Sequence, residues 1–172
     1  MLHHTNLKFN EKLENRTSNS TQYVVLHHSE VVTRHTIEDI HKWHLNKKWA
    51  GVAYHYYIDK DGEIFEGRPK DTVGAHAYGF NQKSVGICFE GDFNKEKIGQ
   101  KQLDAAVMLS ALLSLAYNNA KVIRHSELVK EKDCPGLNFP FDSFYSKVDE
   151  CKKQLVALFG KDFSYSKILD LI

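Results

Sequence analysis

The chain has 172 residues, of which 42% are hydrophobic and 26% are charged, and its formal net charge is +1. This length suits one domain with a single hydrophobic core. The near balance of charge argues against a nucleic-acid binder, because such proteins carry a basic excess clustered on one face. Three cysteines do not form a typical disulfide framework, and their number suits a reducing compartment during folding.

Residues 1–20 are polar and are interpreted as a loose N-terminal arm with no core of its own. They lack the apolar run of a signal peptide, and no segment approaches the roughly 18 apolar residues that a membrane span needs. We therefore expect a protein that is made in the cytoplasm without a signal peptide or a transmembrane segment. We further expect a monomer with one globular domain over residues 21–160 and a polar tail over 161–172.

Runs of apolar residues predict strands that alternate with helices. A short β-branched run ends at His27, and Thr36 with an acid three residues later has the pattern of a helix N-terminus. A turn at residues 59–62 predicts a β-hairpin. The predicted strands are 23–26, 53–58, 63–66, 84–89 and 121–124, and the predicted helices are about 37–47, 100–117 and 141–159. This order predicts an α/β single-domain sandwich with a central mixed β-sheet flanked by helices.

Two histidines directly follow predicted strands, where α/β sheets place functional groups: His27 and His125. Cys134 lies in the next loop, before a proline and a glycine. Two imidazoles and one thiolate suit zinc, and three protein ligands leave a fourth position for water, as in catalytic zinc sites. Spacing alone makes this a weak hypothesis, because no short metal-binding signature is present. A structural zinc would need a fourth ligand, for which His28 or His76 would have to turn inward.

The remaining histidines have simpler interpretations. His28 alternates with His27 in the strand, so we expect a packed residue beside the site. His55 is expected in the core, and His41 and His44 are expected to pack on a helix or lie at its surface. Cys88 falls in a predicted central strand and is interpreted as a small hydrophobic residue.

Eight short segments occur in one order from about residue 23 to residue 158. They are VLHHS at 25–29, GVAYHY at 51–56, GEIFEGR at 62–68, GAHA at 74–77, GFN at 79–81, SVGI at 84–87, HSE at 125–127 and KDCPG at 132–136. Each segment alone is a weak signal, but the ordered set is specific. It resembles the zinc amidase family of phage endolysin amidases, bacterial N-acetylmuramoyl-L-alanine amidases and animal peptidoglycan recognition proteins.

The resemblance implies a role for each matching residue. His27, His125 and Cys134 would bind Zn²⁺. Tyr54 would assist proton transfer and hold the tetrahedral intermediate, and Lys132 would stabilise the oxyanion. The reaction implied is cleavage of the amide between the lactyl group of N-acetylmuramic acid and L-alanine. Residues 21–160 would then be the amidase catalytic domain.

The resemblance also places the loop at residues 74–81 beside the cleft. We therefore expect His76 and Asn81 to contact substrate, although a turn-forming role is the simpler account of Asn81. Glu90 follows the strand where some relatives carry a glutamate that acts as a base. It is interpreted either as that base or as a residue that only flanks the site.

The implied function is hydrolysis of peptidoglycan by a phage or prophage lysin that acts on the bacterial cell wall. A recycling enzyme that works on cytosolic wall fragments is equally consistent with the absence of a signal peptide. The alternative from another class is a non-catalytic peptidoglycan-binding recognition module. Such binders usually lack the last ligand, so the presence of Cys134 beside Tyr54 favours catalysis.

Overall fold

The computed structural model describes residues 1–17, 20–130 and 133–159. A central sheet and its helices make up this part of the chain. The strands are β1 (Leu2–His3), β2 (Tyr23–His28), β3 (Tyr56–Ile58), β4 (Ile64–Glu66), β5 (Ser84–Phe89) and β6 (Lys121–Arg124). The helices are α1 (Ile37–Asn46), α2 (Gln100–Ala116), α3 (His125–Leu128) and α4 (Phe141–Phe159), with a 3-10 turn at Asn81–Lys83.

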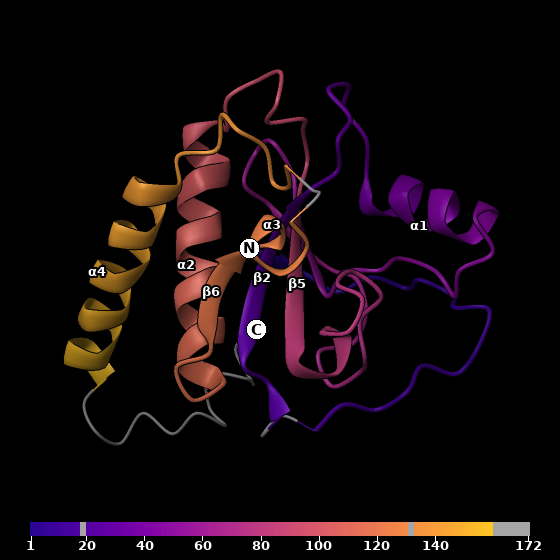
Figure 1. Ribbon diagram of the computed structural model, residues 1–172, viewed down its shortest axis with the longest axis horizontal. Coiled ribbons are helices and arrows are strands. Elements are labelled where there is room, and N and C mark those ends of the chain that lie inside the picture. The colour runs from indigo at the N-terminus through magenta and orange to yellow at the C-terminus, as the bar shows by residue number, and fades with distance from the viewer. Residues whose placement is uncertain (18–19, 131–132, 160–172) are drawn as a thin grey trace.

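The six strands form one mixed sheet in the order β1-β4-β3-β5-β2-β6. The hairpin strands β3 and β4 are antiparallel, and every other neighbouring pair is parallel. Helix α1 lies on one side of the sheet, and α2 and α4 lie on the other (Figure 1). This arrangement confirms the predicted α/β sandwich with a mixed central sheet. No helix among the described residues is both long and apolar enough to cross a membrane.

Strand β5 shows how the period of two divides the core between the faces. Val85, Ile87 and Phe89 pack on the side of α2 and α4, whereas Cys88 packs with α1. Helix α2 buries polar as well as apolar side chains, among them Gln102 and Ser110. Gln102 lies against the sheet, where its amide donates to the carbonyl oxygens of Ile58 and Glu90 at 2.9 and 3.0 Å. Helix α4 packs against α2 as well (Figure 1).

The predicted strand 53–58 is shorter in the structure, and β3 begins only at Tyr56. His55 explains this start, because its backbone N–H donates to Gly86 O at 3.0 Å while its imidazole Nδ1 accepts the N–H of Gly86 at 3.0 Å. The His55 side chain thus takes the place of a backbone carbonyl as the acceptor for Gly86 N–H. The carbonyl oxygen of Ala53 accepts from Ala75 N at 3.0 Å. A second difference is the short helix α3 at His125–Leu128, which is not among the helices that the sequence predicts.

The interpretation of residues 1–20 as a loose arm is wrong for the part that the structure describes. Leu2–His3 forms an edge strand that pairs in parallel with β4. Leu7 and Phe9 then pack against the core cluster under α1. A strand of two residues is too short to produce a sequence pattern. It forms because the edge of β4 offers backbone groups with which it can pair. The predicted tail at 161–172 lies outside the described residues.

The buried histidines predict an acid-sensitive fold. Burial lowers the pKa of His55 to about 3 and that of His44 to about 4, from an ordinary value of 6.5. Below about pH 6.5 these histidines therefore bind protons in the unfolded chain but stay neutral in the folded protein. The free energy of unfolding consequently decreases as the pH falls.

We expect His55→Gln, which cannot titrate, to weaken this pH dependence. Between pH 7 and pH 4 the variant should lose about 3 kcal/mol less unfolding free energy than the wild type. Urea denaturation at both pH values measures the difference, whatever the variant loses at pH 7. An equal loss in the two proteins would contradict the assignment.

Candidate metal centre

His27 and His125 come together because β2 and β6 are parallel. The two strands pair from Tyr23 opposite Lys121 to Leu26 opposite Arg124. His27 and His125 each follow the last of these pairs by one residue, at the carboxyl edge of the sheet. The centroids of their rings are 4.4 Å apart.

Cys134 reaches the same edge from the segment after α3. Its Sγ lies 3.6 Å from Nδ1 of His27. Gly136, two residues after Cys134, packs on the loop after β5. A Cβ added there would lie 2.4 Å from the carbonyl carbon of Phe93. Asn138 N donates to Phe93 O at 2.8 Å. Only glycine permits this approach, and the contact holds the Cys134 segment against the sheet edge.

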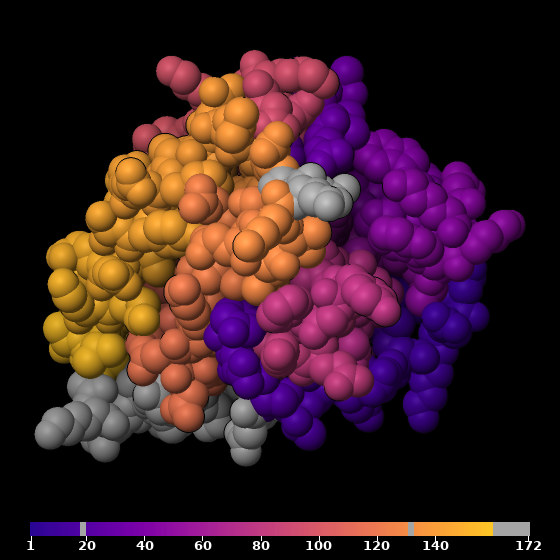
Figure 2. Space-filling view, viewed as in Figure 1, coloured from indigo at the N-terminus to yellow at the C-terminus, as the bar shows by residue number. Residues whose placement is uncertain are grey.

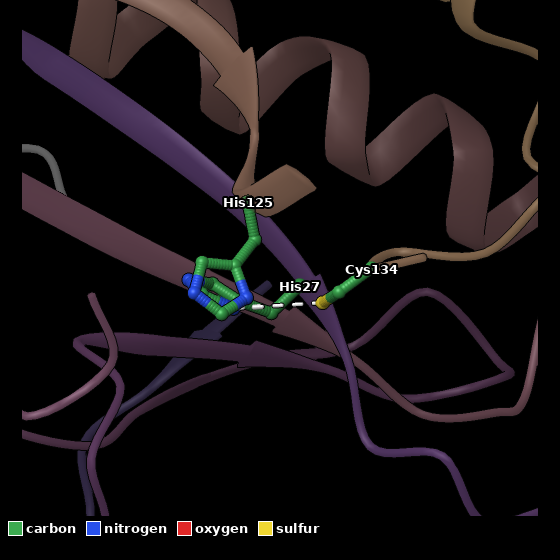
Figure 3. Close-up of side chains that lie close together, drawn as sticks. All are labelled: His27, His125 and Cys134. Carbon is green, nitrogen blue, oxygen red and sulfur yellow. Dashed lines mark hydrogen bonds between the residues drawn. The ribbon is translucent and has the colours of Figure 1, made fainter. Parts of the chain in front are cut away.

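The three side chains point toward one another and fit a metal site (Figure 3). Their ligand atoms all lie within 4.8 Å of one another. Tetrahedral zinc with bonds of about 2.3 Å to sulfur and about 2.0–2.1 Å to nitrogen separates these atoms by about 3.6 Å. The distance between His27 Nδ1 and Cys134 Sγ matches this value. Burial lowers the pKa of His27 well below its ordinary value, and His76 and His125 lower it further, so the imidazole is neutral and can ligate.

The other nitrogen of His27 faces the loop before β5. His27 Nε2 lies 3.0 Å from Nδ1 of His76, whose side chain is buried. Asn81 Oδ1 accepts the backbone N–H groups of His76 and Ala77 at 2.9 and 2.8 Å. Both His76 and Asn81 line the cleft, and their expected contact with substrate stays a prediction. Within the protein, Asn81 shapes the turn that presents His76.

Tyr54 lies beside the cluster, with its ring centroid 5.1 Å from that of His27. Helix α1 positions the segment before it, because His41 Nδ1 accepts from Val52 N at 3.1 Å and His44 Nδ1 accepts from Ala53 N at 3.2 Å. Of the two placements expected for these histidines, packing and surface, the structure shows packing, because both side chains are buried. Burial raises the pKa of Tyr54 well above its ordinary value of 10.0, and the nearby thiols raise it further. The hydroxyl therefore stays protonated and can donate a hydrogen bond.

A cleft of about 770 Å³ opens over the cluster. Trp43 and Trp49 line it from α1 and the loop after α1, and Tyr78 lines it from the loop before β5. These aromatic side chains are 38%, 43% and 94% exposed. The sequence did not single them out, because only tertiary packing decides which aromatic side chains stay exposed. Figure 2 shows the α1 segment and the orange segment after β6 on either side of a hollow.

The remaining predicted residues divide into three cases. Lys132 lies outside the described residues. His28 is buried and accepts the N–H of Phe93 on Nδ1 at 3.0 Å, as expected of a packed residue. The buried carboxylate of Glu90 accepts the backbone N–H groups of Lys60 and His35 at 2.8 and 3.1 Å. Glu90 does not line the cleft, so the structure favours the interpretation that it only flanks the site.

Comparison with known proteins agrees with this geometry. A family model described as N-acetylmuramoyl-L-alanine amidase matches residues 1–137. The endolysin of Klebsiella phage KP32 is 32% identical over 107 residues, which are 59% of this chain and 70% of that protein. Peptidoglycan-recognition protein SC2 of Drosophila melanogaster is 31% identical over 134 residues, which are 70% of this chain and 71% of that protein.

Solved structures give the same result. N-acetylmuramoyl-L-alanine amidase LysC from Clostridium intestinale is 34% identical with a TM-score of 0.79, over 87% of this chain and 97% of that chain. Drosophila PGRP-LB in complex with tracheal cytotoxin is 28% identical with a TM-score of 0.72, over 84% and 93% of the two chains. The protein therefore belongs to the N-acetylmuramoyl-L-alanine amidase family. Its function is that of a peptidoglycan amidase.

The position of Glu90 leads to a prediction that separates a structural carboxylate from a catalytic base. Glu90→Gln should lower the free energy of unfolding by about 1–3 kcal/mol, because charge-assisted bonds to Lys60 N and His35 N weaken. The kcat of the folded variant on purified cell walls should be unchanged. A catalytic base would instead cost about 10²-fold or more in kcat at full stability, and that result would reverse the assignment.

Proposed function

We propose that the protein is a zinc-dependent N-acetylmuramoyl-L-alanine amidase in which His27, His125 and Cys134 hold the metal. The observation that carries the proposal is the convergence of these three ligand atoms within 4.8 Å at the floor of the cleft. Three protein ligands leave a coordination position open, which distinguishes a catalytic from a structural zinc site. Bound zinc supplies a Lewis acid that polarises the scissile carbonyl and makes water an effective nucleophile near neutral pH.

The residues of the chain supply the remaining chemistry. Tyr54 keeps its proton because of burial, so its hydroxyl donates to the oxygen that becomes negative in the transition state. The buried, neutral His27 binds without first losing a proton. We retain Lys132 as an oxyanion donor on the strength of the sequence resemblance alone.

The shape and lining of the cleft support a muramyl peptide as substrate. Its exposed aromatic side chains, Trp43, Trp49 and Tyr78, offer apolar faces around a polar, histidine-rich floor. A glycopeptide presents both kinds of surface, with sugar ring faces beside amides and carboxylates. The relative that was solved with tracheal cytotoxin supports the same class of ligand.

We further propose that the protein acts as a lysin on the bacterial cell wall. The likeness to endolysins of several phages supports this role over recycling of cytosolic wall fragments. The relationship to peptidoglycan-recognition proteins keeps the binding module as the competing function. The first experiment distinguishes the two.

Removal of zinc with a chelator should abolish the release of new alanine amino termini from purified cell walls, and added zinc should restore it. Cys134→Ser should resemble the chelated protein, because a hydroxyl is a much poorer zinc ligand than a thiolate. Cys151→Ser is the matched control, since Cys151 lies on α4 beside Met108 and away from the cleft. Full activity of Cys134→Ser would remove Cys134 from the site.

Two other results would change the proposed function. New sugar reducing ends in place of amino termini would identify a glycosidase. Retention of the protein on purified walls without release of either product would identify a binding module.

Tyr54→Phe tests the proposed donor separately from the metal. The variant should lose about 10²-fold in kcat, because the hydroxyl acts on charge that develops only in the transition state. Its zinc affinity should equal that of the wild type, since the ring packing beside His27 is kept. A Tyr54→Phe enzyme with the kcat of the wild type would show that Tyr54 only packs.

A further inference from the structure

His76 connects a proposed metal ligand to a chain of hydrogen bonds that leads away from the cleft. His27 Nε2 lies 3.0 Å from His76 Nδ1, and His76 Nε2 lies 3.5 Å from the hydroxyl of Ser84. Ser84 Oγ in turn lies 2.8 Å from the carbonyl oxygen of Phe80. A carbonyl only accepts, so the far end of the chain sets the direction of every bond in it.

Each hydrogen bond in the chain therefore has a defined donor and acceptor. Ser84 donates its hydroxyl proton to Phe80 O, which leaves the serine oxygen as the acceptor for His76 Nε2–H. A neutral His76 with its proton on Nε2 has a lone pair on Nδ1. That lone pair accepts the Nε2–H of His27. His27 Nδ1, which faces Cys134 Sγ, is then the nitrogen with a free lone pair.

Two glycines independently indicate that the space is shaped for this imidazole. A Cβ added at Gly74 would lie 2.4 Å from Cδ2 of His76, and one added at Gly86 would lie 2.7 Å from it. Neither glycine has a positive φ, so backbone conformation does not require glycine at these positions. The His76 ring occupies the volume that their side chains would fill.

We propose that His76 is a positioning residue that fixes the tautomer and the orientation of His27 for metal binding. This assignment rests on the proposed zinc site, and it is separate from the predicted contact of His76 with substrate. Partners that hold the second nitrogen of a ligating histidine commonly contribute about 10–100-fold to metal affinity. His76 does so through a neutral imidazole where many sites use a carboxylate.

Three variants at one position test the proposal. His76→Asn can place its amide oxygen where Nδ1 of His76 lies and so still accept from His27. His76→Gln has the same amide one carbon farther out, near the position of Nε2, and His76→Leu fills the cavity without any acceptor. We expect the zinc Kd of the Asn variant to stay near that of the wild type, and those of Gln and Leu to rise about 10–100-fold.

The measurements do not depend on amidase activity. Competition with a chromogenic chelator gives the zinc Kd, and the thermal midpoint of the zinc-free protein reports any structural loss. Long-range ¹H–¹⁵N spectra of the zinc-free protein report the tautomer of His27. The wild type and His76→Asn should carry the proton on Nε2, whereas His76→Leu should populate both tautomers.

The outcomes separate the two proposals. A wild type that does not bind zinc would end the proposed function. Zinc binding by the wild type with equal Kd values for the Asn and Gln variants would overturn the role of His76 alone. If His76→Leu does not fold, the comparison of Asn with Gln still decides, because the two differ in the position of one amide.

Discussion

The strands β5, β2 and β6 run parallel, so all three end at the same edge of the sheet. This pairing brings His27 beside His125 and places Cys88 opposite His27 in the register. Cys134 then needs only a loop that crosses the same edge, which the close contact of Gly136 with Phe93 holds in place. The candidate metal centre depends on these three parallel strands, because a shift of one residue in either pairing would turn a candidate ligand to the opposite face.

Both nitrogens of the His27 imidazole have a polar neighbour, and these neighbours lie on opposite sides of the ring. Nδ1 faces Cys134 and the cleft, whereas Nε2 faces His76 and the interior. Burial removes competing water from both, which keeps the ring neutral and makes each hydrogen bond direction matter more. Tyr54 lies at the open side of the candidate centre, where the proposed substrate would bind.

Three of the ten histidines in this chain hold backbone groups in place. His41, His44 and His55 each accept a backbone N–H on Nδ1, from Val52, Ala53 and Gly86. These bonds fix the irregular segment on either side of Tyr54, where a regular strand would leave the tyrosine in another position. A high histidine content is therefore a poor guide to metal ligands, and the location of each ring decides its role.

The sequence by itself determined the elements with strong local patterns and the identity of the three candidate ligands. Strands 84–89 and 121–124 follow from β-branched periodicity, the turn at 59–62 follows from its residues, and the ordered segments pointed to His27, His125 and Cys134. The tertiary structure alone decided the edge strand Leu2–His3, the late start of β3 at Tyr56 and the exposure of Trp43 and Trp49. It also decided that His76 bonds to His27, 49 residues away, and that Glu90 binds backbone outside the cleft. Periodicity reports which face of an element is apolar, whereas a hydrogen bond between distant residues exists only after the strands have paired.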